Sequence, residues 1–282
     1  MNKRKVLVVG LGLMGGSYAM TLKRLGFEVW AIDKSKESIE YAIENKIIDK
    51  GDFRDNEELI SGCDCIIMAV YPSGIVKWIE DNKDKFKKHI FITDVTGVKS
   101  AIVTKIQDIL GPDYEFIASH PMAGRETNGV ANANDKMFRD ANFIVVYTDK
   151  NTSEGIRWCE NLGRILGFNR ISHLTPEEHD DIIAYVSQLT HCIAVSLMNC
   201  DGAQDMVSYT GDSFRDLTRI AKINENMWTE LFFMNKDRLI KRMDSFIKEI
   251  TDMRDLIVRE DAENLKEKMR ISTARRKKFD EK

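Results

Sequence analysis

The chain has 282 residues, which is enough for one large domain or two ordinary domains with proper hydrophobic cores. Hydrophobic residues make up 43% and charged residues 31%, so we expect a soluble globular protein with no charge-free stretch long enough to span a membrane. A formal net charge of -3 gives no electrostatic reason to expect a nucleic-acid partner. The five cysteines form no CxxC pair, which indicates reduced thiols in a cytoplasmic protein and no metal site.

The chain opens with a predicted strand, a glycine-rich turn and a helix. Lys5–Val9 is a continuous apolar strand, and GLGLMG follows it at once before a helical pattern that ends at Gly26. The pattern GxGxxG in this context is typical of a dinucleotide site, because glycines let the backbone approach a pyrophosphate beside a helix N-terminus. The alternative is a glycine-rich turn without a nucleotide. The residues that we predict to bind the cofactor here are Gly10, Gly12, Leu13, Met14 and Gly15.

An acidic residue follows the next predicted strand, residues 27–32. Asp33 stands where a carboxylate would accept hydrogen bonds from the adenine ribose diol, and it would repel a 2′-phosphate. This position therefore favours NAD over NADP. Lys34 follows directly and leaves NADP open.

Helices and strands then alternate, which predicts an α/β fold with a doubly wound parallel sheet. We expect helices over 35–45, 73–86 and 98–110, strands over 64–70, 91–93 and 116–118, and a final strand–helix–strand over 142–148, 153–166 and 169–173. Two strand exits should line the cofactor crevice. One consists of Val70, Tyr71 and Pro72, and the other contains Thr96, which is a candidate catalytic residue or a plain helix N-cap.

The stretch Ser119-His120-Pro121-Met122-Ala123-Gly124 follows the short apolar run 116–118. Pro121 restricts the backbone of His120. Open α/β sheets place their catalytic residues at the ends of buried strands, so the imidazole of His120 is a candidate catalytic group. The alternative is a loop histidine that only caps a turn.

The pattern changes after His173. Thr175, Pro176 and Glu178 form a capping box at the start of a helix, and little strand signal follows. We therefore expect a dinucleotide-binding domain over 1–173 and an all-helical substrate-binding and dimerisation domain over 174–282.

Several polar residues of the helical half are candidates for the substrate site. Gln188 and His191 share a helix face, while His179, near the start of that helix, is interpreted as a satisfied structural residue. Arg219 is either a solvated surface residue or a bidentate carboxylate ligand. A seam with spacings of 4-3-4-3-4 predicts helix packing within the subunit or a homodimer, and consists of Leu239, Met243, Phe246, Ile250, Met253 and Ile257.

Six segments together resemble the prephenate dehydrogenase family of tyrosine biosynthesis, over nearly the whole chain. They are GLGLMGGS at 10–17, TDVTGVK at 93–99, SHPMAGRE at 119–126, TPEEHD at 175–180, SQLTH at 187–191, and SFRDLTRIA with MW at 213–228. The resemblance implies the oxidative decarboxylation of prephenate to 4-hydroxyphenylpyruvate, with NAD as the hydride acceptor.

The resemblance also implies roles for single residues. His120 matches the histidine that takes the proton of the substrate hydroxyl, and Arg219 matches the arginine that holds a carboxylate. His191, Gln188, Trp228, Ser119 and Gly124 are expected at the substrate. Many members carry a serine where this chain has Gly97, so Thr96 or a water would act there, and Gln188 replaces a histidine of some members.

Other functions remain open at this stage. Arogenate could replace prephenate, but no acidic residue is evident for its ammonium group. A β-hydroxyacid dehydrogenase would share the glycine turn, but such enzymes typically use a lysine of the second domain as acid/base and have no place for the HPMAG loop. A non-catalytic NAD-sensing regulator would share the turn without needing His120 and Arg219 together. Tyrosine is a plausible inhibitor, because its ring resembles that of the product.

Overall fold

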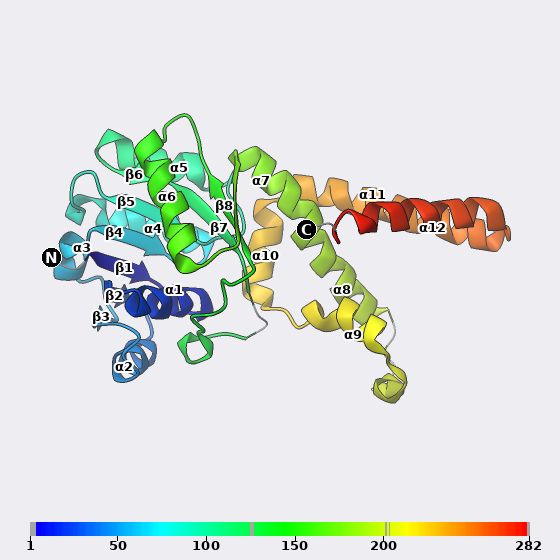
Figure 1. The fold of residues 1–282 in the computed structure, drawn as a ribbon, viewed down its shortest axis with the longest axis horizontal. Coiled ribbons are helices and arrows are strands. Elements are labelled where there is room, and N and C mark those ends of the chain that lie inside the picture. Colours follow the sequence, from blue (N-terminus) through cyan, green and yellow to red (C-terminus); the bar gives the residue numbers. More distant parts are fainter. Residues whose placement is uncertain (1–3, 125–126, 201, 203, 281–282) are drawn as a thin grey trace. The chain divides into compact units, whose positions relative to one another are not determined.

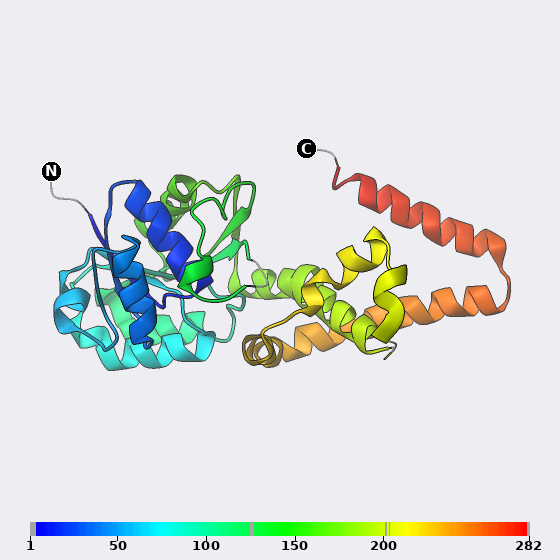
Figure 2. The ribbon, with the colours of Figure 1, turned by 90° about the horizontal axis from the view of Figure 1, so that it is seen from below.

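The computed structural model describes residues 4–124, 127–200, 202 and 204–280. It divides into two compact units, Met1–Asn235 and Lys236–Lys282. The second unit consists of helices α11 (Lys236–Val258) and α12 (Ala262–Lys277), which run in opposite directions (Figure 2). The last two residues of the motif at 119–126, Arg125 and Glu126, lie outside the described residues.

The first sheet has six parallel strands in the order β3-β2-β1-β4-β5-β6 (Figure 1), which confirms the doubly wound arrangement. Its strands are β1 (Lys5–Val9), β2 (Glu28–Ile32), β3 (Lys50–Asp52), β4 (Cys65–Met68), β5 (Phe91–Asp94) and β6 (Glu115–Phe116). The strand order reverses between β2 and β4, on either side of β1. A parallel sheet places its ligand crevice at the carboxyl ends of the strands beside such a reversal.

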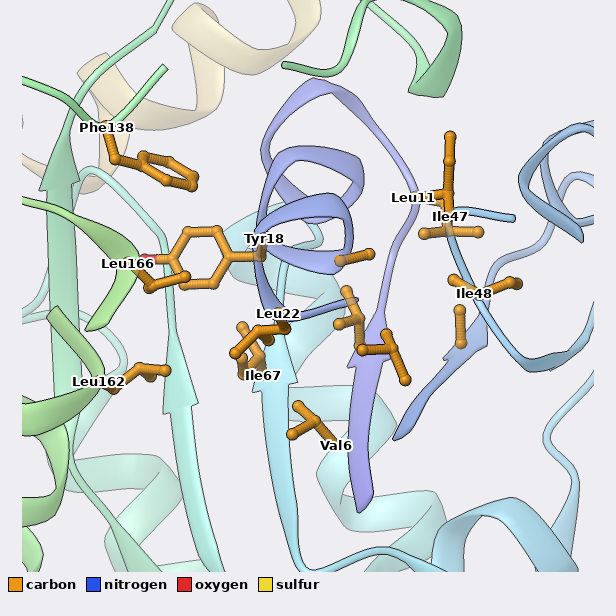
Figure 3. Packing of buried hydrophobic residues seen from close by; sticks show 14 of the residues in the cluster. Val6, Leu11, Tyr18, Leu22, Ile47, Ile48, Ile67, Phe138, Leu162 and Leu166 are labelled. Carbon is orange, nitrogen blue, oxygen red and sulfur yellow. The ribbon is translucent and has the colours of Figure 1, made fainter. Parts of the chain in front are cut away.

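Both faces of this sheet are covered by helices. On one face α1 (Leu13–Arg24), α2 (Lys36–Glu44) and α6 (Ser153–Leu166) pack on Val6 and Val8 of β1, together with Tyr18 and Leu22 (Figure 3). On the other face α3 (Glu57–Gly62), α4 (Pro72–Asn82) and α5 (Val103–Leu110) cover Leu7 and Val9. Burial on both faces explains why the central strands are continuously apolar.

Three elements differ from the sequence-based expectation. Strand β3 and helix α3 were not predicted, because β3 is a three-residue edge strand with the polar sequence KGD. The helix expected over 98–110 begins only at Val103, because residues 99–102 form a turn.

A second, three-stranded sheet carries the histidine of the motif at 119–126. Strand β7 (Ala118–Met122) runs antiparallel to β8 (Asn142–Val146), and β9 (Arg170–Leu174) is parallel to β8. The predicted strand 116–118 is therefore split: β6 ends in the first sheet and β7 begins the second. His120 lies inside β7, opposite Ile144, and not at a strand exit as expected.

From residue 175 onward the described chain contains helices and no strand. These are α7 (Pro176–Ile183), a π-helical turn Ala184–Gln188, α8 (Leu189–Asn199), a 3-10 turn Gln204–Tyr209, α9 (Asp212–Thr218), a 3-10 turn Arg219–Ala221 and α10 (Glu225–Met234), followed by α11 and α12. The predicted capping box is confirmed, since Thr175 and Glu178 bond reciprocally at the start of α7. This cap fixes where the two following residues, His179 and Asp180, lie.

The sequence analysis expected no charge-free stretch long enough to span a membrane, and this expectation was wrong. Residues 182–200 contain no Asp, Glu, Lys or Arg, and the continuous helix Pro176–Asn199 is long and apolar enough to cross a membrane by length and composition. A core helix passes the same test. The buried polar side chains of this helix bond to other parts of the chain, as described below, but only 28% of its most apolar stretch is buried, and Tyr185 and Val186 are exposed.

Candidate functional site

A cavity of about 700 Å³ lies at the carboxyl ends of the first sheet's strands, against the helices of the second half of the chain. It brings together thirteen of the residues predicted from the sequence: Gly12, Leu13, Met14, Val70, Tyr71, Pro72, Thr96, His120, Gly124, Gln188, His191, Arg219 and Trp228. Four other predicted residues, Gly10, Gly15, Asp33 and Ser119, are not among its lining residues.

The glycines of the first turn have different roles. Gly10 has a φ of +98°, and a Cβ there would lie 2.6 Å from the carbonyl oxygen of Ala69. A Cβ on Gly15 would lie 1.9 Å from the carbonyl oxygen of Gly10. Only glycine fits these two positions, so both shape the turn. A Cβ on Gly12 would meet no atom within 4 Å and would point into open space.

The N-terminus of α1 is suited to a pyrophosphate. Gly12 is its N-cap, no side chain caps it, and its first turn carries no acidic residue. The amides of this turn therefore face the cavity mouth with a partial positive charge. The open space at Gly12 is the place where a phosphate could approach the backbone.

Asp33 supports the same turn from the second strand. Its carboxylate accepts hydrogen bonds from the backbone N–H of Leu11 at 2.5 Å and of Ser35 at 2.8 Å. A carboxylate has further lone pairs, so Asp33 can hold the loop and still accept from a ribose hydroxyl. The residues present fit a dinucleotide.

A buried ion pair lies beneath the cavity. The ammonium of Lys99 donates to the carboxylate of Asp94 at 2.6 Å and to the carbonyl of Ser119 at 2.7 Å, and both charged side chains are fully buried. A third contact runs from Lys99 to the hydroxyl of Thr96 at 3.2 Å, so all three ammonium protons have acceptors. Burial lowers the pKa of Lys99, while the carboxylate of Asp94 opposes that shift. The pair fixes the backbone directly before His120.

Two predicted site residues belong to this buried network. The hydroxyl of Ser119 donates to the carbonyl of Asp94 at 2.7 Å, and its backbone N–H donates to the Asp94 carboxylate at 3.0 Å. Ser119 is fully buried and points into the core, which corrects its expected contact with substrate. The Thr96 hydroxyl lines the cavity but donates to Asp94, so its proton is committed to the network. Its catalytic assignment is not supported by these bonds.

Two further side chains stand behind His120. Its Nδ1 lies 2.8 Å from Nε2 of His179, and Nδ1 of His179 lies 2.8 Å from Oδ1 of Asp180. His179 and Asp180 are fully buried on α7. We call these three residues the His–His–Asp chain.

The hydrogen bonds fix the direction of this chain. The carboxylate of Asp180 is an acceptor, so Nδ1 of His179 carries the proton and its Nε2 accepts. Nδ1 of His120 is then the donor. This leaves Nε2 of His120 without a proton, available to the cavity as a base.

Electrostatics keep His120 neutral. Burial holds its pKa well below the usual range, and the neighbouring His179 and Lys99 lower it further. Burial also lowers the pKa of His179, although Asp180 opposes that shift. A neutral imidazole at ordinary pH is the form that accepts a proton.

Asp180 also joins α7 to the turn after β5. It accepts from the backbone N–H of Lys99 at 2.9 Å and of Ser100 at 2.8 Å. Hydrogen bonding to His179 and to Ser100 outweighs burial and lowers the pKa of Asp180. Its carboxylate is therefore ionised, as the direction of the His–His–Asp chain requires.

The helical wall carries an aromatic pair and a cation. The rings of His191 and Trp228 lie 3.7 Å apart between centroids at 31°, and Nδ1 of His191 donates to the carbonyl of Ser187 at 3.0 Å. Arg219 lines the same cavity. These residues can hold a ring and a carboxylate.

Gln188 lines the cavity but has a structural role. Its amide donates to the carbonyl of Leu231 at 2.9 Å and accepts from Asn235 at 2.8 Å. These bonds join the π-helical turn Ala184–Gln188 to α10 and its C-terminal cap, and they do not support the expected contact of Gln188 with substrate.

Sequence reasoning missed His179 and Asp180 as members of the site. His179 was interpreted as a satisfied structural histidine, because a single helical histidine carries no signal of its own. The available signal was the adjacent pair His179-Asp180 after a capping box, in a chain with a second histidine, His120, whose backbone is restricted by a proline. Among the described residues, no group of three or more His, Cys, Asp and Glu side chains is placed to hold a metal ion.

Both halves of the chain match models of one protein family. Residues 18–167 match the family model "Prephenate dehydrogenase, nucleotide-binding domain", and residues 175–271 match "Prephenate dehydrogenase, dimerization domain". The prephenate dehydrogenase of Bacillus subtilis is 33% identical over 94% of this chain and 74% of its own length. The cyclohexadienyl dehydrogenase of Zymomonas mobilis is 26% identical over 95% of this chain and 94% of its own.

The fold is also similar to a solved structure. Prephenate dehydrogenase from Aquifex aeolicus, in complex with hydroxyphenyl propionate and NAD+, superposes with a TM-score of 0.89 at 28% identity. The match covers 99% of both chains.

The two glycines give a matched test of the cofactor turn. Gly12→Ala should fold with near-normal stability, because the added methyl meets no atom, but should weaken NAD+ binding by occupying the phosphate position. Gly15→Ala should lose stability by about 1–3 kcal/mol, because its Cβ overlaps the Gly10 carbonyl. Urea unfolding and calorimetric NAD+ titration measure both. Unchanged NAD+ affinity in Gly12→Ala would contradict this placement.

Proposed function

The chain belongs to the prephenate dehydrogenase family, and from this premise we propose that it converts prephenate to 4-hydroxyphenylpyruvate with NAD+ as the hydride acceptor, in tyrosine biosynthesis. One observation carries the proposal. The base His120 lies on the same cavity as the glycine turn and Arg219. A small molecule in that cavity can meet all three.

The reaction of prephenate requires only a few functions of the protein. Prephenate carries a hydroxyl on one ring carbon and two carboxylate-bearing groups on the opposite carbon. Bound NAD+ supplies the acceptor for the hydride that leaves the hydroxyl-bearing carbon. Loss of carbon dioxide from the opposite carbon makes the ring aromatic, so the reaction is strongly favoured. The protein has to orient the ring, hold its carboxylates and remove the hydroxyl proton.

His120 takes that proton. Its Nε2 accepts the proton of the substrate hydroxyl as the carbonyl forms. The resulting imidazolium keeps its Nδ1 bond to His179, and the ionised Asp180 behind it stabilises the positive charge. His179 and Asp180 therefore position and support the base without touching substrate.

The cofactor side is assigned to the glycine turn and the strand exits. Gly12, Leu13 and Met14 would hold the pyrophosphate at the N-terminus of α1, and Asp33 would accept from the adenine ribose. Val70, Tyr71 and Pro72 lie on the same cavity wall. Lys34, beside Asp33, is exposed. The test below therefore includes NADP as a weaker alternative cofactor.

Arg219 is assigned to the ring carboxylate, and His191 with Trp228 to the ring. Gly124 leaves room at the cavity wall, with no atom within 4 Å of a Cβ placed on it. Among the described residues that line the cavity, none is Asp or Glu. An arogenate ammonium would find no carboxylate partner among these described residues, which supports prephenate over arogenate. The same cavity fits the ring of tyrosine, and a titration of the initial rate with L-tyrosine tests inhibition.

We assign dimerisation, the pairing with a second copy of this chain, to the helical half. The matched dimerisation model covers residues 175–271, and this half exposes many apolar side chains, such as Tyr185, Val186 and Ile250.

We place the domain boundary near residue 174, between the two matched family segments, although the compact units divide after Asn235. Free thiols at all five cysteines fit a cytoplasmic enzyme.

Turnover is the first test. Purified protein with prephenate and NAD+ should form NADH, and His120→Asn should lower kcat by about 10²–10⁴-fold with NAD+ affinity retained. Assays with arogenate and with NADP run in parallel. Absence of turnover with prephenate would remove the proposed function, and normal kcat in His120→Asn would remove the base assignment.

The pH profile tests the His–His–Asp chain. The neutral form of His120 is active and its pKa is lowered, so kcat should stay constant down to pH 6.5 and fall only in more acid solution. Asp180→Asn should lower kcat by about 10²-fold or more and shift the acid limb to still lower pH, because the carboxylate that favours imidazolium is gone.

The matched control is Glu177→Gln on the exposed side of α7. It should leave both kcat and the profile unchanged. A wild-type acid limb above pH 6.5, or an unaltered profile in Asp180→Asn, contradicts the assignment.

The dimer is tested by sedimentation. The protein at micromolar concentration should sediment as a species of twice the 32.4 kDa chain mass, because the exposed apolar side chains of the helical half would be covered. A monomer at that concentration is the opposing result.

A further inference from the structure

The substrate has two carboxylates, and Arg219 accounts for only one of them. In prephenate both the ring carboxylate and the pyruvyl side chain are attached to the same ring carbon, opposite the hydroxyl. Two cations should therefore lie close together at the end of the cavity that faces away from His120. This requirement rests on the proposed function.

Lys222 is placed beside Arg219. Arg219 begins the 3-10 turn Arg219–Ala221, and Lys222 is its C-cap, where the backbone becomes extended. A 3-10 helix has three residues per turn, so Lys222 follows Arg219 by one turn. Both residues line the cavity that His120 lines, so this turn presents two cationic side chains to one space.

Lys222 has no anionic partner among the residues that the structure describes. Its ammonium makes no hydrogen bond or ion pair with any described residue, whereas Lys77 on α4, for example, pairs with Asp81 at 2.7 Å. No described residue that lines the cavity is acidic. The side chain is exposed, so it can stay charged and hydrated until an anion binds. A cation with no described partner, on a cavity whose described lining residues include no Asp or Glu, is suited to a carboxylate.

We propose that Lys222 binds the pyruvyl carboxylate of prephenate while Arg219 binds the ring carboxylate. Arogenate carries an ammonium beside the corresponding carboxylate. A positive charge at Lys222 repels that ammonium, so this lysine also discriminates between the two substrates. Lys222 thereby adds a specificity-determining residue to those assigned above.

The test compares three variants with the wild type. Lys222→Met removes the charge and keeps most of the length, and Lys222→Arg keeps the charge. Lys88→Met is the matched control, because Lys88 is an exposed lysine without a partner among the described residues and does not line the cavity. The readouts are kcat, the KM of prephenate, arogenate and NAD+, and the Kd of 3-(4-hydroxyphenyl)propionate in the presence of NAD+.

Lys222→Met should raise the KM of prephenate roughly tenfold or more, with kcat and the KM of NAD+ nearly unchanged. Its preference for prephenate over arogenate should fall, because the repulsion of the ammonium is lost. 3-(4-Hydroxyphenyl)propionate has only the side-chain carboxylate, so its Kd should rise by a similar factor. Lys222→Arg and Lys88→Met should stay within about threefold of the wild type.

An unchanged KM for prephenate in Lys222→Met would overturn the proposal. So would a rise confined to the KM of NAD+, which would assign Lys222 to the pyrophosphate. The titration with 3-(4-hydroxyphenyl)propionate needs no turnover. If the wild type failed to oxidise prephenate, the proposed function would fail, and the titration would still decide whether Lys222 binds a carboxylate.

Discussion

The chemistry of this site depends on one interaction, the 2.8 Å hydrogen bond between the imidazoles of His120 and His179. Its direction is set from behind by Asp180, an ionised acceptor at 2.8 Å from the other nitrogen of His179. Two neutral rings and one carboxylate can satisfy both bonds in only one arrangement of protons. That arrangement leaves the cavity-facing nitrogen of His120 basic, and the low pKa of His120 keeps it so. A base without this support would have no fixed tautomer.

The fold supplies the two sides of that bond from distant parts of the chain. His120 lies in β7, whose first residues are held by the buried pair of Lys99 and Asp94. Asp180 and His179 lie in the first two turns of α7, which the Thr175–Glu178 cap starts at a fixed residue. Asp180 then bonds the backbone of Lys99, so one buried network positions both histidines. Removing one partner of a buried ion pair such as Lys99 and Asp94 typically costs about 3–5 kcal/mol, so the network is costly to disrupt.

Local signals predicted the glycine turn, the alternation of strands and helices, and the start of α7, because each depends on residues a few positions apart. Contacts over long separations were not predictable from pattern. His120 and His179 are 59 residues apart, and the chain passes from β6 of the first sheet to β7 of the second at Ile117 without any signal in the sequence. For the same reason Ser119, Thr96 and Gln188 appeared as site residues, although their polar atoms bond to the protein interior. Polar residues beside a site look alike in sequence whether they face the cavity or the core.

The tautomer of His120 can be measured directly, by ¹⁵N NMR of protein labelled at its five histidines, with assignment by His120→Asn and His179→Asn. At neutral pH we expect a neutral His120 with its proton on Nδ1 and none on Nε2, and a neutral His179 with its proton also on Nδ1. A His120 protonated at Nε2, or present as imidazolium at neutral pH, would contradict the account.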